Sequence, residues 1–91
     1  MNIDRLIHSP ARLSIMTQLM VVESADATWL KGQTDLSWGN LATHIQKLEE
    51  VGYVTVKKDF VGKKPRTVFR LSKSGIEAFE IYKKNILEIL Q

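Results

Sequence analysis

The sequence of 91 residues contains no cysteine, and this absence excludes several kinds of protein. Disulfide scaffolds, thiolate zinc sites and cysteine nucleophiles all require a thiol. Long apolar runs are absent too, since the longest stretch without an acidic or basic residue, 36–46, has about half the length of a membrane span. With Asp4 and Arg5 near the start and no small-residue cleavage site, no signal peptide is evident. We therefore expect a cytoplasmic protein with no membrane partner.

The motifs of common enzymes are also lacking. There is no Gly-x-Ser-x-Gly elbow, no Gly-x4-Gly-Lys phosphate loop and no His-Glu-x-x-His helix. The acids are scattered, and no pair stands out as general acid and base. His8 and His44 are far apart and lack the spacing of metal ligands. We expect no enzymatic activity, no cofactor and no metal site.

What is present is the composition of one folded domain. Apolar residues make up 44% and charged residues 25%, values typical of a globular protein and not of a disordered tail. A chain of this length forms one core, so we expect a single domain over residues 1–91.

Basic residues are concentrated in one segment. Between residues 57 and 73 there is a single acid, Asp59, against seven bases: Lys57, Lys58, Lys63, Lys64, Arg66, Arg70 and Lys73. Such a segment attracts polyanions by releasing their counterions. By itself it is equally compatible with a solvated hairpin that keeps the protein soluble.

Helix signals dominate the first half of the chain. Ser9 and Pro10 predict the start of a broad apolar helix that ends in the polar residues 23–26. Thr28 is the expected cap of a short helix reaching about Thr34, and Ser37 caps a third helix that Gly52 terminates. The third helix carries a narrow buried stripe at spacings of four and three residues, formed by Leu41, Ile45 and Leu48.

The second half begins with alternating residues. Residues 53–58 and 67–71 predict two strands, joined by a turn-rich basic loop over 59–66. Ser72 caps a last helix of about eighteen residues, 73–90. A short helix, a turn and a second helix form a helix-turn-helix, and the basic hairpin that follows is a wing. The predicted fold class is therefore α+β: a winged helix-turn-helix with a two-stranded wing and a long C-terminal helix.

This order of elements resembles small winged-helix transcriptional regulators of bacteria and archaea, relatives of the MarR and ArsR families. The most specific pieces are Leu36-Ser37-Trp38-Gly39-Asn40-Leu41, His44-Ile45-Gln46-Lys47-Leu48-Glu49 and Lys63-Lys64-Pro65-Arg66-Thr67. The resemblance implies a third helix in the major groove of DNA and a wing on the backbone or minor groove. The ArsR metal motif contains cysteine, and MarR proteins have longer terminal helices than this chain, so the resemblance leaves any small-molecule effector unknown.

The third helix is the first candidate site. Opposite its buried stripe lie short polar groups, Asn40 and Thr43, which suit the reading of base edges. The candidate DNA-binding residues are Ser37, Trp38, Gly39, Asn40, Thr43, His44 and Lys47. Two of them have an alternative inside the protein: Trp38 is slightly favoured to pack against Trp29, and His44 is as well suited to an internal polar bridge.

The wing is the second candidate site. We expect its tip to hold Lys63, Lys64 and Arg66, with Lys57 and Lys58 on the approaching strand. The lysines would neutralise phosphates, and Arg66 could enter the minor groove.

The C-terminal helix, residues 73–90, carries an apolar stripe wider than one small domain covers. We expect it to form a homodimer, with an interface that includes Ala78, Tyr82, Ile86, Ile89 and Leu90. The alternative is that the helix folds back over the first helix of its own chain.

These observations predict a sequence-specific binder of double-stranded DNA that regulates transcription, acting as a repressor by occupying an operator. Repression is favoured over activation because no activation module is visible. The alternative is a winged-helix protein-interaction module in a larger assembly, which has no need of a strongly basic hairpin.

Overall fold

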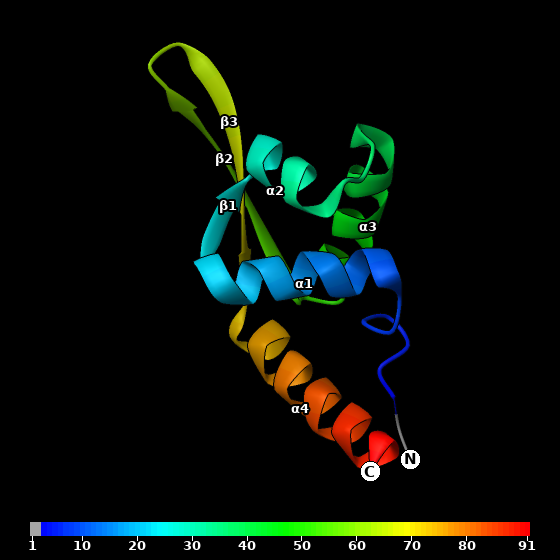
Figure 1. Cartoon of the computed structure of the whole chain (residues 1–91). Coiled ribbons are helices and arrows are strands. Elements are labelled where there is room, and N and C mark those ends of the chain that lie inside the picture. Colours follow the sequence, from blue (N-terminus) through cyan, green and yellow to red (C-terminus); the bar gives the residue numbers. More distant parts are fainter. Residues whose placement is uncertain (1–2) are drawn as a thin grey trace.

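The computed structural model describes residues 3–91, which form four helices and a three-stranded antiparallel sheet (Figure 1). The order is α1 (Pro10–Val22), β1 (Ser24–Asp26), α2 (Ala27–Thr34), α3 (Trp38–Glu50), β2 (Val54–Val61), β3 (Lys64–Leu71) and α4 (Lys73–Leu90). The predicted α+β winged helix-turn-helix is confirmed, together with its two-stranded wing, β2–β3, and the long C-terminal helix.

The core forms around α1, which lies against α2, α3 and β3. Its buried side chains are Ile15, Met16 and Leu19, and the stripe of α3 packs on the same core. Ile7, in the turn that leads into α1, is fully buried. Burying one such aliphatic side chain stabilises the fold by about 1.5–3 kcal/mol, so this packing fixes α3 against the rest of the domain.

The strand β1 is not predicted by the sequence pattern, because its polar residues are typical of a helix end. It pairs antiparallel with β3, which places the buried Ala25 opposite Phe69. The next residue, Asp26, caps α2 by accepting a hydrogen bond of 2.8 Å from the backbone N–H of Trp29. The prediction of Thr28 as the cap is therefore wrong.

The strands of the wing are longer than expected, and the turn between them is shorter. β2 and β3 pair continuously from Val54–Leu71 to Val61–Lys64, so most of the predicted loop over residues 59–66 is strand. Only Gly62 and Lys63 form the turn, and Gly62 has a φ of 62°, which glycine adopts without strain.

Two predicted serine caps are confirmed. The Ser37 hydroxyl accepts a hydrogen bond from the backbone N–H of Asn40, and the Ser72 hydroxyl accepts one from Gly75. Any larger residue in place of Gly75 would destabilise the fold, because a Cβ there would lie 2.1 Å from the carbonyl oxygen of Tyr53. This close approach sets the start of α4 against the end of the α3–β2 connection.

The wing and α4 project from opposite ends of the domain, which measures 51 × 25 × 22 Å (Figure 1). The N-terminal segment lies beside α4 and is tied down twice: the Tyr53 hydroxyl donates to Asp4 Oδ2 at 2.6 Å, and His8 Nδ1 is 2.8 Å from the Tyr82 hydroxyl. The Asp4 bond raises the pKa of Tyr53 to about 12. Within residues 3–91 no helix has both the length and the apolarity to cross a membrane.

Candidate nucleic-acid interface

The structure presents the outer face of α3 to solvent. Leu41, Ile45 and Leu48 are buried, and the opposite face is exposed. The exposed predicted residues on and before this helix are Ser37, Trp38, Gly39, Asn40, Thr43 and Lys47. Six of the seven predicted residues of this site are therefore accessible to solvent.

The first two turns of α3 are polar but nearly uncharged. The Thr43 hydroxyl donates to the carbonyl oxygen of Gly39 at 2.9 Å, which fixes its rotamer and leaves its oxygen free to accept. A Cβ on Gly39 would meet no atom within 4 Å, so the backbone here is open to a close approach. The acids of the helix, Glu49 and Glu50, lie at its C-terminal end.

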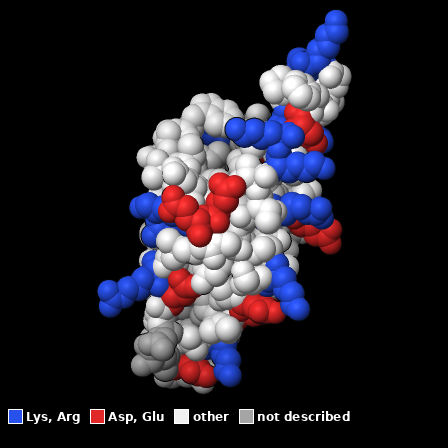
Figure 2. All heavy atoms as spheres, turned by 180° about the vertical axis from the view of Figure 1, so that it is seen from behind, with Lys and Arg blue, Asp and Glu red and all other residues white. Residues whose placement is uncertain are grey.

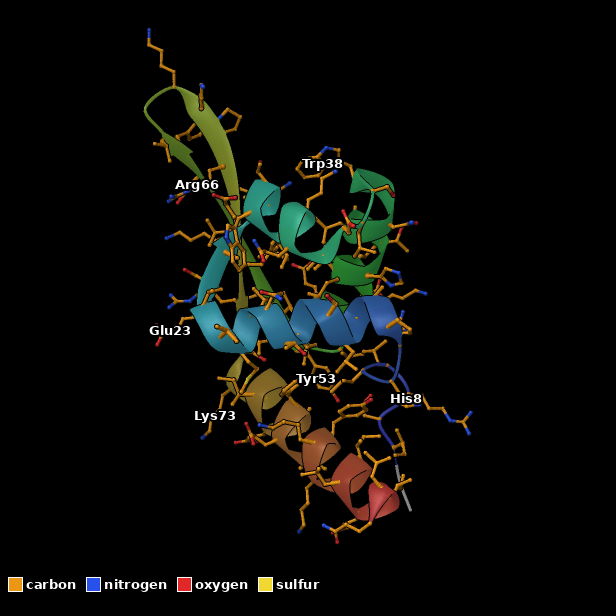
Figure 3. The ribbon with its side chains drawn as sticks, in the orientation of Figure 1. His8, Glu23, Trp38, Tyr53, Arg66 and Lys73 are labelled. Atoms are coloured by element: carbon orange, nitrogen blue, oxygen red, sulfur yellow. The ribbon has the colours of Figure 1, made fainter. Side chains whose placement is uncertain are left out.

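Trp38 begins α3 and is 54% exposed. Its ring neighbour is the ammonium group of Lys31 on α2, 5.5 Å from the ring centroid. The favoured packing of Trp38 against Trp29 does not occur among the ring contacts of residues 3–91. Trp38 lies instead at the end of the helical body from which the wing projects (Figure 3).

His44 takes the internal role that the sequence left open. Its Nδ1 lies 3.0 Å from Nη1 of Arg12 on α1, and its side chain is half-buried. Burial lowers the pKa of His44, and the positive charges of Arg12 and Lys47 lower it further. A neutral imidazole accepts the Arg12 hydrogen bond, so this bridge helps to hold α3 on α1.

A groove of about 410 Å³ separates α3 from the wing. Trp38, Ala42 and Gln46 line one side, and Lys58 of β2 lines the other. Most of the remaining lining is apolar, and Glu49 also lines the groove, so its one base is accompanied by one acid. Lys58 is the lining residue that suits a phosphate beside the uncharged start of α3.

The strand register divides the basic residues of the wing between two faces. Side chains alternate along a strand, so Lys58 continues the inner face of Val54 and Val56, towards α3. Lys57 lies on the outer face, opposite Val68. Lys63 is in the turn and Lys64 opposes Val61 on the outer face. Figure 2 shows basic side chains along the projecting hairpin up to its end.

Arg66 differs from the prediction because it does not lie at the tip. It opposes Asp59 in the third pair from the turn, and two hydrogen bonds of 2.9 and 2.8 Å join its guanidinium to both carboxylate oxygens. The bond to Arg66 lowers the pKa of Asp59. Arg66 is thus already paired within the hairpin, where it links the two strands.

Sequence reasoning missed three residues that the structure brings to this surface. The Lys31 ammonium group lies over the Trp38 ring, and the Arg12 guanidinium group is hydrogen-bonded to His44. Phe60 falls in the predicted loop, but it sits near the tip of β2 on the inner face. The alternation of Val54, Val56 and Lys58 continues to Phe60 and could have revealed it.

The predicted dimer residues of α4 fall into two groups. Tyr82 is only 5% exposed and belongs to the core of its own chain, together with the half-buried Ala78 and Ile86. Ile89 and Leu90, at the distal end of the helix, are 51% and 75% exposed.

A helix-turn-helix with its third helix exposed, followed by a projecting basic hairpin on a three-stranded sheet, defines the winged-helix class. The family model for the winged helix DNA-binding domain matches residues 11–90. The chain belongs to this family. Its fold and family are those of DNA-binding transcriptional regulators and not of enzymes.

Several known proteins are similar to this chain in sequence or in structure. An uncharacterized protein of Methanocaldococcus jannaschii is 34% identical over 87 residues, which is 96% of this chain and 91% of that protein. The transcriptional regulator homologue of Pyrococcus horikoshii superposes with a TM-score of 0.89 at 29% identity, covering 96% of this chain and 86% of the other. A MarR-like regulator of Bacillus cereus gives 0.76 at 21% identity, with 96% and 65% covered.

Proposed function

We propose that the protein binds a specific sequence of double-stranded DNA through the first two turns of α3. The observation that carries this proposal is the face itself: Asn40 and Thr43 are exposed, short and uncharged, on a helix fixed by its buried stripe. Short hydrogen-bonding groups on a rigid helix can read the donors and acceptors of the major groove. An ordinary solvent-facing helix is richer in lysine and glutamate.

The surroundings of α3 support this placement. Ser37 and the open backbone at Gly39 stand at the helix N-terminus, where N–H groups and the helix dipole favour a phosphate. The groove leading to Lys58 continues this path towards the wing. Glu49 and Glu50 would repel phosphates, which directs DNA to the N-terminal half of α3.

The regulatory consequence we propose is repression by occupancy. A bound domain excludes other proteins from the same stretch of duplex, and no chemical step is required. The Pyrococcus horikoshii neighbour is described as a transcriptional regulator homologue, which supports a role in transcription.

We further propose that the protein acts as a homodimer joined through the distal part of α4. Ile89 and Leu90 are exposed there on either side of the half-buried Ile86, at the end of a helix that projects from the domain. Exposed apolar side chains gathered at one place mark an interface. A two-fold axis through this end would use the same residues on both chains and present two copies of α3 to a palindromic site.

A binding selection from random duplex DNA, at a fixed salt concentration near 0.1 M, tests the proposal. The expected result is a consensus sequence for the wild type. Asn40→Glu is the matched control: its side chain is exposed, so the fold is kept, but a carboxylate faces the phosphates and enrichment disappears. If the wild type enriches no sequence, the proposal is wrong and the protein-interaction module becomes the better interpretation.

A further inference from the structure

The tip of the wing is apolar on one face, although the hairpin as a whole is basic. Phe60 is 72% exposed, and its cross-strand partner is Pro65. On the opposite face the neighbouring pair is Val61 and Lys64, and Lys63 forms the turn. In Figure 2 uncharged atoms lie just below the basic side chain at the projecting end.

The hairpin extends beyond the helical body as a free two-stranded ribbon. β1 pairs with β3 only as far as Val68, the partner of Lys57, so the last four residues of β2, from Lys58 to Val61, form a two-stranded ribbon with β3. At ~3.4 Å per residue this ribbon reaches about 14 Å. Its length exceeds the ~6 Å width of a minor groove, so it can cross a backbone and reach the next groove.

The orientation of Phe60 follows from the register. Val54, Val56 and Lys58 face the α3 side, and Phe60 is the next residue of that series. Grooves alternate along a duplex, so with α3 in the major groove an element that projects past it meets the adjacent minor groove. The walls of that groove are deoxyribose rings, which accept apolar contact.

The charges around Phe60 indicate which partner covers it. Lys58 precedes it on the same face, and Lys63 and Lys64 flank it at the turn. The acid nearest in sequence, Asp59, is neutralised by Arg66. A large apolar side chain surrounded by lysines fits a polyanion that offers an apolar surface between its phosphates, which describes the minor groove of DNA.

We propose that Phe60 is an apolar wedge that enters the minor groove and partly unstacks one base step. The inference rests on the proposed DNA-binding function and adds a residue to it. Side chains of this kind open a base step and bend the duplex by about 20–90°. Phe60 would then give the protein a preference for deformable steps such as TA or CA at a fixed distance from the bases read by α3.

The test uses the duplex of about 30 base pairs selected by the wild type, with fluorophores at its ends and 2-aminopurine placed step by step in the flanking minor-groove region. Phe60→Thr removes the wedge and keeps a strand-favouring residue. Val61→Thr is the matched control, since Val61 is the neighbouring exposed side chain on the other face. Phe60→Leu should restore a wedge.

We expect wild type and Phe60→Leu to bend the duplex and to brighten 2-aminopurine at one step. Phe60→Thr should abolish both signals and reduce affinity by about tenfold or more, with the salt slope unchanged because every phosphate-binding lysine is still present. Equal bending by Phe60→Thr and Val61→Thr, or a straight duplex with the wild type, would overturn the wedge while leaving sequence-specific binding intact. If the wild type selects no duplex at all, the proposed function itself has failed.

Discussion

At the residue scale, base reading is assigned to Asn40 and Thr43, which are exposed one turn apart on α3. We expect Asn40→Ala or Thr43→Ala to cost about 1–3 kcal/mol at one base position, because each removes hydrogen bonds to a base edge. The slope of log K against log salt should stay the same. Binding to selected and random duplexes measures both quantities, and Thr17→Ala is the control, since Thr17 is an exposed threonine of α1 that donates to the carbonyl oxygen of Leu13 as Thr43 does to that of Gly39. An equal weakening on both kinds of duplex would contradict direct reading.

A substitution at Gly39 should affect the stability of the fold and the affinity for DNA differently. A Cβ there meets nothing in the free protein, and alanine is favoured over glycine inside helices, so Gly39→Ala should keep or raise stability, by up to about 1 kcal/mol. Bound DNA would lie against this backbone, and the added methyl group should weaken binding. Thermal melting and a titration with the selected duplex test the two effects. Unchanged affinity would place the DNA away from the start of α3.

His44 gives the domain a pH-dependent element. Its pKa lies below the usual value, so the unfolded chain binds this proton more readily than the folded protein. The contribution of neutral His44 to stability is therefore complete above the usual imidazole pKa of about 6.5 and is lost as the pH falls from there through the lower pKa of the folded protein. His44→Gln can still accept from Arg12 and should reduce the loss of stability between about pH 7 and pH 5. Urea unfolding at several pH values measures this slope; identical slopes would assign it to other groups.

Individual contacts are the least predictable part of the site. The sequence places His44 at the border of the buried stripe, but its hydrogen bond with Arg12 depends on how α1 crosses α3. The same is true of Trp38, whose neighbour Lys31 comes from another helix. Exposure of Asn40 and Thr43, in contrast, follows directly from helical periodicity.

At the scale of elements, the wing is expected to bind DNA without regard to sequence. Replacing Lys63 and Lys64 together by alanine should weaken specific and random duplexes alike and reduce the salt slope by about 0.9 for each phosphate that is no longer neutralised. Lys73→Ala with Lys84→Ala is a control of equal charge, since both lysines are exposed on α4. Titrations at several salt concentrations measure the slope. If the two double substitutions reduce the affinity and the salt slope equally, the effect comes from the net charge of the protein and not from the wing.

Elements with their own periodicity are predictable from the sequence, and those that depend on pairing are not. The predicted bounds of α1, α3 and α4 agree with the structure, although only α3 and α4 begin with a serine whose side chain caps the helix. β1 has only three residues and becomes a strand because β3 lies beside it. Pro65 suggests a loop, but it lies beyond the last β1–β3 pair, where β3 can accommodate a residue without an N–H.

At the scale of the whole molecule, the order of elements is enough to predict the fold, but the width of the α4 stripe is misleading in part. Tyr82 belongs to the apolar stripe and to the predicted interface, yet its side chain is buried, with His8 at its hydroxyl. A helical wheel cannot show what a distant segment of the chain will bury. Ala78, Tyr82 and Ile86 pack on the core, so the exposed residues of the predicted interface, Ile89 and Leu90, lie in the last turn of α4.

This confinement makes the dimer testable without damage to the protomer. Ile89 and Leu90 are both exposed, so Ile89→Glu with Leu90→Glu should leave the fold intact while placing four carboxylates at a two-fold interface. We expect the wild type to sediment as a dimer at micromolar concentration and the double variant as a folded monomer.

Ile81→Glu is the matched control for the dimer, because Ile81 is a similarly exposed apolar residue of the same helix about 12 Å along its axis from Ile89. It should remain dimeric. Two linked sites bind a palindromic duplex more tightly than one, so the monomer should also lose affinity for a full site far more than for a half-site. A monomeric wild type, or a double variant that still sediments as a dimer, would show that the exposed end of α4 has another purpose.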